Sequence, residues 1–413
     1  MTRRVYAGFA TWVAMLSLLD CHEDYRDHPP HYRKEPAATS SRMNKHCVAL
    51  LGRRDEPTDA VEDYCRYLGA ALQPLGFSMS IERLCWSELG WRRARRELHR
   101  RAEQWRDGWV FLQYTALAWS RRGFPLAVLR VLRELRTSGA RTAVVFHDAE
   151  PYGGNRAVDY LRRMVQLRAM RKALRLADFA VTTLPAEKIS WLPADCPKTV
   201  FIPVGANLPS PEDAWRKNAD LKNELPTVAV FTVTGDANED RAGQEEVDCI
   251  AKAVRCAAGR VGAIRVALLG RNSERAEKRL RERVDETRVK IDAYGLLEGE
   301  AVVRVLRSAD VLLFARGPIS TGRSSAIAGI ACGLPVIACQ GWETAPPITE
   351  AGVVLVPQER REEFGPALAR VLSDAAYRAS LAERSRRAQE KYFSWSAIAA
   401  KYAEAMRANS SQH

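Results

Sequence analysis

Residues 320–335, with the sequence STGRSSAIAGIACGLP, combine the residue types that hold a phosphate group in proteins. They follow an apolar run at 311–314 that is typical of a buried parallel strand. The helix predicted after the polar turn ends at Gly333, with Pro335 two residues on. Backbone N–H groups at the start of such a helix attract anions, and a nearby arginine adds to that attraction. The candidate donors at this helix start are Ser320, Thr321, Arg323, Ser324 and Ser325.

A helix cap in an ordinary α/β domain is the simpler interpretation of this segment. It explains the serines, because short hydroxyl side chains cap helices, but it leaves Arg323 unexplained. The segment therefore predicts a site for a phosphate or a diphosphate. Arg271 ends another predicted strand, 264–269, and is a candidate to reach the same phosphates, although an arginine in that position is often a plain surface residue.

A second group of reactive side chains, His147, Asp148 and Glu150, follows a predicted strand at 142–146. A carboxylate or an imidazole at a strand end can accept a proton from a hydroxyl group or position a substrate. These three residues are therefore candidate catalytic groups. The alternative is structural, with a capping aspartate and a core histidine before a turn. Gln113 and Tyr114 end the strand 109–114 and are candidates for the same side of a site, unless the tyrosine belongs to the core.

The chain has 413 residues and 46% hydrophobic residues, which fits a globular protein of two ordinary domains. Lysine and arginine number 63 against 50 acidic residues, giving a net charge of +13. Part of the excess gathers at 92–101, which is either a solvated helix face or a surface for anionic lipid. The sequence contains no aromatic-interleaved RNA motif and no zinc-finger spacing, so we predict no nucleic-acid partner.

Nine cysteines are scattered without a C-x-x-C pair. An odd number without metal-ligand spacing predicts reduced thiols and a cytoplasmic protein. The seven histidines are unpaired along the sequence, so we expect no cofactor and no metal site built by the protein itself. A metal carried by a nucleotide substrate stays compatible with this pattern.

Strand-like and helix-like segments alternate from Met43 onward, which is typical of parallel sheets covered by helices on both faces. Residues 1–42 do not match this pattern. They hold an apolar stretch, 5–19, that is shorter than a membrane-spanning helix. We expect them to be a disordered extension, or to precede a true start at Met43. The predicted parts are a first domain at 43–210, a linker at 211–226, a second domain at 227–390 and a terminal helical segment at 391–413.

The second half resembles the donor domain of GT-B glycosyltransferases, close to glycosyltransferase family 4. The similarity is carried by residues 295–314, by the sequence ACGLPVIA at 331–338 and by the ending YFSWSAIA at 392–399. It covers roughly residues 43–407. It implies two doubly wound Rossmann-like domains that face a central cleft, with a nucleotide sugar held by the second domain. It also implies a terminal helix that crosses back to the first domain.

This chain departs from the family at one pair of positions. Members commonly carry two glutamates eight positions apart that contact the donor, and this chain has Ser320 and Ala328 there. It is more similar to a branch that reads roughly Gly-Val-Ser-x-Arg-Arg-x-Ser, with Gly322 in place of the first arginine. The matching residues are Ser320, Arg323 and Ser325.

The resemblance also implies roles outside this segment. Arg241 is the candidate for the basic residues that the family keeps after the first strand of the donor domain, and His147 is implied as a donor or sugar contact. Residues 52–55 match a loop that such enzymes keep near donor and acceptor, although by spacing alone they form a charged turn. The cleft-loop candidates are Arg53, Arg54 and Asp55.

The sequence therefore favours a glycosyltransferase that moves a sugar from a nucleotide-diphosphate sugar to a hydroxyl of a sugar or lipid-linked acceptor. The resemblance implies retention of the anomeric configuration and a place in glycoconjugate or surface-polysaccharide synthesis. We expect it in the cytoplasm, with peripheral membrane contact through 92–101 as a hypothesis. Two alternatives stay open: a non-catalytic GT-B protein that binds a nucleotide sugar or a partner transferase, and a sugar-nucleotide epimerase with Asp292 and Glu343 as acid and base.

Overall fold

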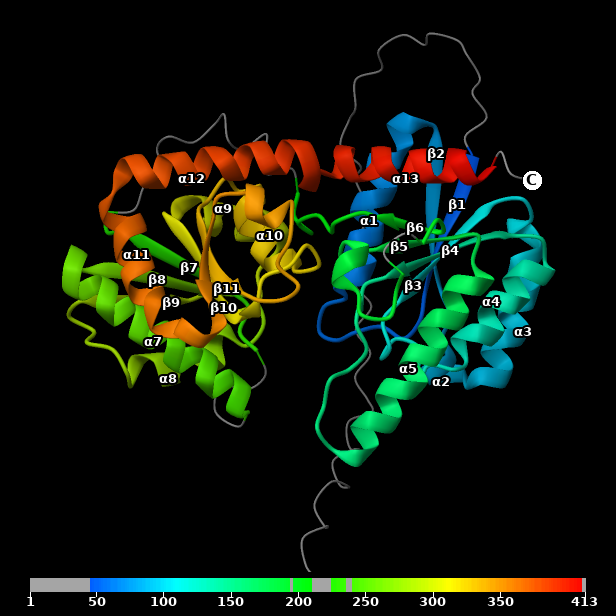
Figure 1. Ribbon diagram of the computed structural model, residues 1–413, viewed down its shortest axis with the longest axis horizontal. Coiled ribbons are helices and arrows are strands. Elements are labelled where there is room, and N and C mark those ends of the chain that lie inside the picture. The colour runs from blue at the N-terminus through cyan, green and yellow to red at the C-terminus, as the bar shows by residue number, and fades with distance from the viewer. Residues whose placement is uncertain (1–44, 194–195, 210–223, 235–239, 411–413) are drawn as a thin grey trace, which may run out of the picture. The chain divides into compact units, whose positions relative to one another are not determined.

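The computed structural model describes residues 45–193, 196–209, 224–234 and 240–410 (Figure 1). The predicted extension at 1–42 and most of the predicted linker at 211–226 lie outside the described residues. Two sheets of six strands are present, and every strand pairing in them is parallel. Helices cover the sheets, as the alternation of segments predicts.

The first sheet has the strand order β2-β1-β3-β4-β5-β6. Its central strands are continuous apolar runs, because parallel strands are covered on both faces and have no solvent side. The strands are β1 Lys45–Leu51, β2 Phe77–Arg83, β3 Trp109–Tyr114, β4 Arg141–Phe146, β5 Phe179–Thr182 and β6 Thr199–Phe201. The helices among them are α1 Ala60–Leu72, α2 Trp86–Leu89, α3 Trp91–Ala102, α4 Val128–Thr137 and α5 Ala157–Leu176.

Strand β2 is a strand that the sequence did not predict. Its sequence, FSMSIER, alternates apolar and polar residues, and only Phe77 of the seven is buried. The reason is its position at the edge of the sheet, where one side of the strand has no neighbour. The continuous apolar pattern that marks the inner strands is therefore absent from it.

The second sheet has the order β12-β11-β10-β7-β8-β9. In chain order this is the Rossmann arrangement, with the first strand, β7, next to the fourth, β10. The strands are β7 Thr227–Phe231, β8 Ile264–Leu269, β9 Val289–Ala293, β10 Val311–Pro318, β11 Val336–Gln340 and β12 Val353–Pro357. The helices are α7 Arg241–Val261, α8 Ser273–Arg281, α9 Gly299–Ser308, α10 Ser324–Ala331, α11 Phe364–Ser373, α12 Ala375–Ala388 and α13 Trp395–Ser410.

In each sheet, some later strands are added on one side of the first strand and the remaining strands on its other side. This change of direction falls between β1 and β3 in the first sheet, and between β7 and β10 in the second. Ligands of doubly wound sheets bind outside the carboxyl ends of the strands at such a point, because the loops there diverge. These two edges are therefore where functional side chains are expected.

The terminal helix α13 packs on the first sheet's helix α1 (Figure 1). The Tyr64 and Tyr402 hydroxyls lie 2.9 Å apart in a buried hydrogen bond, and the Trp395 ring stacks on Tyr67 at a centroid distance of 5.6 Å. The Trp395 Nε1–H also donates to the Ala206 carbonyl at 2.9 Å. Buried aromatic and polar contacts therefore hold the end of the chain against its first half.

Helix α10 lies unusually close to strand β10 because Gly329 faces it. A Cβ atom at Gly329 would lie 2.6 Å from Leu312 Cδ2 and 3.1 Å from Val336 Cγ2. We expect Gly329→Ala to lower the free energy of unfolding by about 1–3 kcal/mol, because the extra methyl overpacks this interface. Urea unfolding followed by circular dichroism measures the change.

Gly259→Ala is the matched control, since Gly259 is also helical, in α7, but a Cβ there would meet nothing within 4 Å. That variant should be neutral or more stable by about 0.5–1 kcal/mol, the ordinary gain from glycine to alanine in a helix. Equal effects of the two substitutions would contradict the close packing of α10 on the sheet.

Candidate functional site

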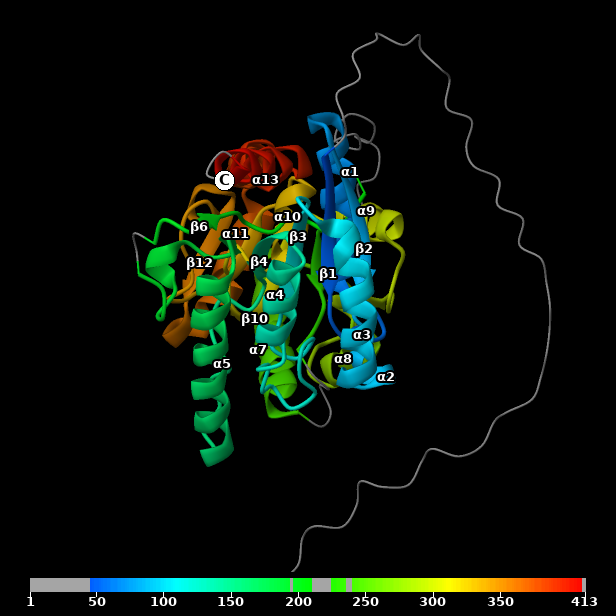
Figure 2. The ribbon, with the colours of Figure 1, turned by 90° about the vertical axis from the view of Figure 1, so that its right-hand side faces the viewer.

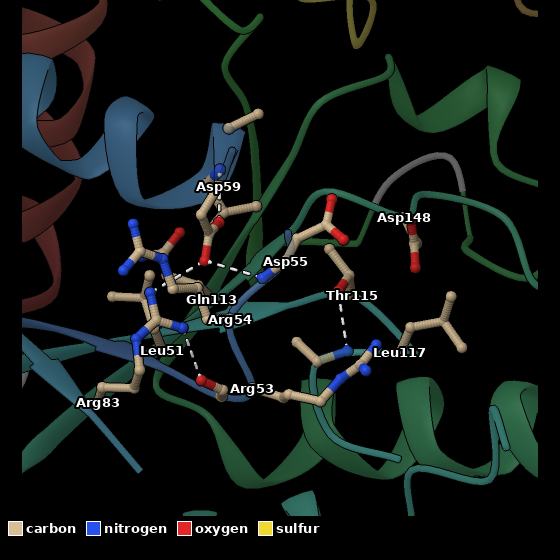
Figure 3. Close-up of a pocket in the computed structure, with 14 residues that line it drawn as sticks. Leu51, Arg53, Arg54, Asp55, Asp59, Arg83, Gln113, Thr115, Leu117 and Asp148 are labelled. Atoms are coloured by element: carbon tan, nitrogen blue, oxygen red, sulfur yellow. Dashed lines mark hydrogen bonds and ion pairs between the residues drawn. The ribbon is translucent and has the colours of Figure 1, made fainter. Parts of the chain in front are cut away.

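A pocket of about 210 Å³ opens at the carboxyl ends of strands β1, β3 and β4 (Figure 3). It lies at the point where the first sheet changes direction. The loop after β1 forms one wall, the residues after β3 form another, and Asp148 after β4 borders it. The side chains that matter for its chemistry are Arg53, Asp59, Arg83, Gln113, Thr115 and Asp148.

The loop at 52–59 is held by Asp59, the residue that caps helix α1. Asp59 Oδ1 accepts hydrogen bonds from the backbone N–H groups of Val61 and Glu62, at 3.1 and 3.2 Å. Its Oδ2 accepts one from Arg83 Nη2 at 2.9 Å. Arg83 Nη1 donates to the Gly52 carbonyl at 2.9 Å. The edge strand β2 thus contributes, through Arg83, to the rigidity of the pocket wall.

Gly52 allows the two walls of the pocket to approach closely. A Cβ at this position would lie 2.3 Å from the Ala118 carbonyl oxygen, so no other residue fits without a backbone shift. The next N–H, that of Arg53, donates to the same carbonyl at 2.8 Å. The backbone on both sides of Arg53 is therefore fixed before any ligand binds.

Arg53 is the cation of this loop that lacks an anionic partner among the described residues. Its Nε is buried and has no hydrogen-bond partner in that part of the chain. Arg54, by contrast, lies 3.8 Å from Glu56, and Asp55 lies 3.1 Å from Arg271. Of the three cleft-loop candidates, Arg53 is the one whose charge is available to the pocket.

Asp148 is the carboxylate at the opposite side of the pocket. Its Oδ2 accepts a hydrogen bond from the Ala116 N–H at 2.7 Å. Burial raises the pKa of Asp148, while that hydrogen bond and the positive charge of Arg323 oppose the rise. A carboxylate with a raised pKa, fixed by a backbone donor, is suited to accept a proton from a hydroxyl group.

His147 is held in a neutral form. Its Nε2 lies 2.8 Å from Gln113 Oε1, while the Gln113 amide donates to the Phe111 carbonyl, so the imidazole Nε2–H is the donor. The ring also meets the edge of Tyr64 at a centroid distance of 5.1 Å. Burial lowers the pKa of His147 to about 4. His147 therefore acts as a hydrogen-bonding group and carries no charge at neutral pH.

Two other candidates of the first half are turned to other partners. Both Glu150 oxygens accept hydrogen bonds from Ser190, one from its backbone N–H and one from its hydroxyl at 2.7 Å. Tyr114 is fully buried and packs against Phe146 at a centroid distance of 5.2 Å. The expectation that Tyr114 lines the acceptor side is wrong, because a side chain in the core has no surface to offer.

Three arginines of the second sheet influence one another electrostatically. Burial lowers the pKa of Arg316, and the charges of Arg323 and Arg271 lower it further, against the opposing effect of Glu246. Arg271 follows β8, Arg316 lies near the end of β10, and Arg323 directly precedes α10. Arg323, directly before the helix N-terminus, and Arg316, whose pKa its charge lowers, make this edge attractive to an anion.

Arg316 is the member of this group that the sequence analysis missed. Its position lies inside a register irregularity of β10, between Phe314 and Pro318, and the following Gly317 has a φ of +81°. A bulge of this kind re-aims a side chain out of the regular alternation. The signal was Gly317, one residue before the strand end, but a glycine alone does not say which neighbour is redirected.

The predicted donors at the start of α10 divide into two kinds. Ser320 and Thr321 are buried, and the Thr321 hydroxyl donates to the Thr183 carbonyl at 2.5 Å. Ser324 and Ser325 form the first turn of α10, which has no side-chain cap. The first turn and Arg323 are therefore open to a ligand, while Thr321 ties this loop to the first sheet.

The remaining two arginine candidates differ from Arg323 in their partners. Arg271 donates to the Thr58 hydroxyl and carbonyl and pairs with Asp55, so it links the second sheet to the loop after β1. Arg241 is 90% exposed and pairs with Glu245 on the surface of α7. Neither guanidinium has the enclosed position of Arg316.

The pocket of the first sheet and the arginine-rich edge of the second sheet lie next to each other. The Thr321 hydroxyl donates to the Thr183 carbonyl just after β5, and the Thr183 hydroxyl donates to the Phe146 carbonyl at the end of β4, two residues before Asp148. Against the effect of burial, the positive charge of Arg323 lowers the pKa of Asp148. In the part of the chain that the structure describes, no three His, Cys, Asp or Glu side chains converge on a metal position. The arrangement is an anion-binding edge on one sheet beside a pocket with a carboxylate on the other.

Comparison with known proteins is informative at the level of the fold. No family model matches the chain, and no curated protein matches its sequence. Among solved structures, Anabaena Alr3699/HepE, determined with UDP and glucose, matches 88% of this chain and all of its own at 14% identity and a TM-score of 0.58. The sucrose-phosphate synthase of Thermosynechococcus elongatus matches 89% of this chain and all of its own, at 19% identity and a TM-score of 0.59.

A glycosyltransferase from Rickettsia africae is similar over 89% of this chain and 98% of its own, with 13% identity and a TM-score of 0.59. Two parallel six-stranded sheets with flanking helices and these full-length matches decide the fold. It is GT-B. The predicted fold class is thereby confirmed. At sequence identities of 13–19%, the similarity establishes the fold of this chain. Its chemistry has to be argued from its own residues.

Proposed function

We propose that this protein is a glycosyltransferase that moves a sugar from a nucleotide-diphosphate sugar to a hydroxyl group of an acceptor. The observation that carries the proposal is geometric: the Thr321 hydroxyl donates to the Thr183 carbonyl, and the Thr183 hydroxyl donates to the Phe146 carbonyl, so the loop that carries Arg323 lies beside the strand end that carries Asp148. Glycosyl transfer needs both groups in one place, because negative charge develops on the departing diphosphate while the attacking hydroxyl loses its proton. Positioned charges stabilise that change without reorganising during the reaction.

In this proposal the diphosphate binds at the start of α10. Arg323 and Arg316 provide positive charge, and the first turn of the helix, with Ser324 and Ser325, provides N–H groups and hydroxyls. Because Ser320 and Ala328 stand where the family commonly has two glutamates, Arg323 and the helix start must supply more of the binding of the donor. The structures of Anabaena HepE with UDP and with UDP-glucose support a nucleotide sugar as the donor class.

The acceptor binds in the pocket after β1 and β3, where Asp148 accepts the hydroxyl proton and Arg53 faces any anionic group that the acceptor carries. His147 and Gln113 hold the wall behind it. We propose a sugar or lipid-linked acceptor in glycoconjugate or surface-polysaccharide synthesis, a transfer that retains the anomeric configuration, and membership of the family 4 branch without the paired glutamates. The family resemblance supports these finer points. The proposal needs no cofactor beyond the donor.

A thermal-shift screen with nucleotide sugars tests the donor site. A ligand at 100 times its dissociation constant adds about 2.7 kcal/mol to the free energy of unfolding. This should raise the unfolding temperature by roughly 5 °C for the right nucleotide diphosphate sugar. Free nucleoside monophosphates, which lack the second phosphate, are the matched control and should give a smaller shift. Equal shifts with mono- and diphosphates would contradict a diphosphate site.

A non-catalytic GT-B protein that binds a nucleotide sugar is the second candidate. The observation in its favour is that Ser320 and Ala328 are buried and carry no carboxylate, while Arg271 is already bound to Thr58 and Asp55. The same screen separates the two when the nucleoside diphosphate released from each stabilising donor is measured with acceptor sugars and lipids. Stabilisation without release would favour the binding protein.

A further inference from the structure

The exposed apolar side chains of this protein gather at the start of helix α5. Five of the ten large apolar residues that are well exposed in the described part of the chain lie within 152–164. They are Tyr152, Val158, Tyr160, Leu161 and Met164. Tyr160 and Met164 are each 63% exposed. Soluble surfaces carry such residues singly, so a group of five indicates a surface that meets something other than water.

Three of these residues, Tyr160, Leu161 and Met164, lie on the outer face of α5, and basic residues continue that face. Positions 160, 161, 164, 168, 171 and 175 recur every three or four residues, so they line one side of a helix. Arg168, Arg171 and Arg175 are exposed. The opposite side of the helix is buried at Gln166, Met170 and other positions. The outer face is thus apolar in its first turns and basic in its last turns.

Residues 152–176 themselves bring little negative charge to this face. Asp159 is the one acidic residue in 152–176, against seven basic residues. It is buried and pairs with Arg156 and Arg162. The N-terminal end of α5 also extends past the neighbouring helices of the first sheet (Figures 1 and 2). The apolar turns at this end of α5 can therefore contact a surface outside the protein while the sheet stays in place.

We infer that the outer face of α5 is a docking surface for an anionic lipid bilayer. Exposed apolar side chains enter the boundary of the acyl chains, while arginines on the same helix face bind anionic headgroups. An anionic bilayer is complementary to both features of this face, since its headgroups are negatively charged and its interior is apolar. Residues 148–156 connect the surface directly to the carboxylate of the pocket.

This surface is different from the basic helix that the sequence analysis singled out. On α3, Arg95 pairs with Glu134 at 3.1 Å and Arg101 with Glu82 at 2.8 Å. Its aromatic residue, Trp91, stacks on Trp86 at a centroid distance of 4.9 Å. Helix α3 therefore has charge but no exposed large apolar side chain, and it supplies the control for the test.

Vesicle sedimentation of the full chain tests the inference without any nucleotide sugar or acceptor, so its result does not depend on the proposed reaction. We expect binding to vesicles of phosphatidylcholine and phosphatidylglycerol in equal amounts, little binding to phosphatidylcholine alone, and weaker binding as salt rises. Arg168→Ala with Arg171→Ala should weaken binding about 25-fold, or about fivefold for each arginine. Tyr160→Ser with Met164→Ser should weaken it at least about tenfold.

The matched control is Arg92→Ala with Arg96→Ala, which removes two exposed charges of α3 and should leave binding within about twofold. All substituted residues are exposed, so we expect the variants to fold. Unfolding temperatures equal to that of the unsubstituted protein would confirm this. Three results would overturn the inference: equal binding to neutral vesicles or none to either kind, a loss in the α3 pair as large as in the α5 pair, or self-association of the protein that the Tyr160 and Met164 substitutions abolish.

Discussion

Arg323→Ala is expected to lower kcat/KM for transfer from a nucleotide-diphosphate sugar by about 10²–10³-fold, the usual effect of removing one positioned donor to developing negative charge. Arg323 precedes α10 and acts on both Asp148 and Arg316. Its loss therefore removes positive charge from the start of the helix, where the departing diphosphate would bind. Release of the nucleoside diphosphate under donor-limited conditions measures the effect.

Arg255→Ala is the control for this variant, because Arg255 is an exposed arginine on α7 of the same sheet. It should change kcat/KM by less than about twofold, since single exposed charges contribute little. Arg323→Lys keeps the charge without the planar fork and should recover part of the rate. Full activity of Arg323→Ala, in a protein with an unchanged unfolding temperature, would rule out the diphosphate site at α10.

Asp148→Asn is expected to lower the same constant by about 10²–10⁴-fold, because an amide cannot accept the hydroxyl proton. The substitution keeps the acceptor of the Ala116 N–H bond. Because burial raises the pKa of Asp148, its charged form opposes folding at neutral pH, and this cost disappears in the asparagine variant. The unfolding temperature should therefore stay the same or rise while activity falls.

The pH dependence of kcat/KM checks the same assignment. The base must be ionised, so activity should fall as pH decreases through the pKa of Asp148, which burial raises above the ordinary aspartate value. Arg323 lowers that pKa, so in any residual activity of Arg323→Ala the acidic limb should shift to higher pH. Glu150→Gln is the comparison variant. A larger loss of kcat/KM in Glu150→Gln than in Asp148→Asn would indicate that Glu150, and not Asp148, is the base.

The sequence by itself predicted much of the fold. Buried parallel strands read as continuous apolar runs, so β3 and β8 were predicted with the bounds they have. Edge strand β2 escaped this pattern because its residues alternate. The sequence also predicted a helix start within 320–325 and a candidate carboxylate at Asp148, since both follow strand ends, where the loops of a parallel sheet collect.

Which of those strand-end residues act together was decided by the tertiary structure alone. Arg316 is redirected by a bulge in β10, Arg53 is left without a partner while Asp55 is taken by Arg271, and Tyr114 points into the core. Helix caps and hydrophobic periodicity depend on residues a few positions apart, so they can be recognised directly in the sequence. Charge pairing can join residues far apart in the chain, such as Asp55 and Arg271, which are 216 positions apart, and only the packing of the two sheets brings these side chains into range.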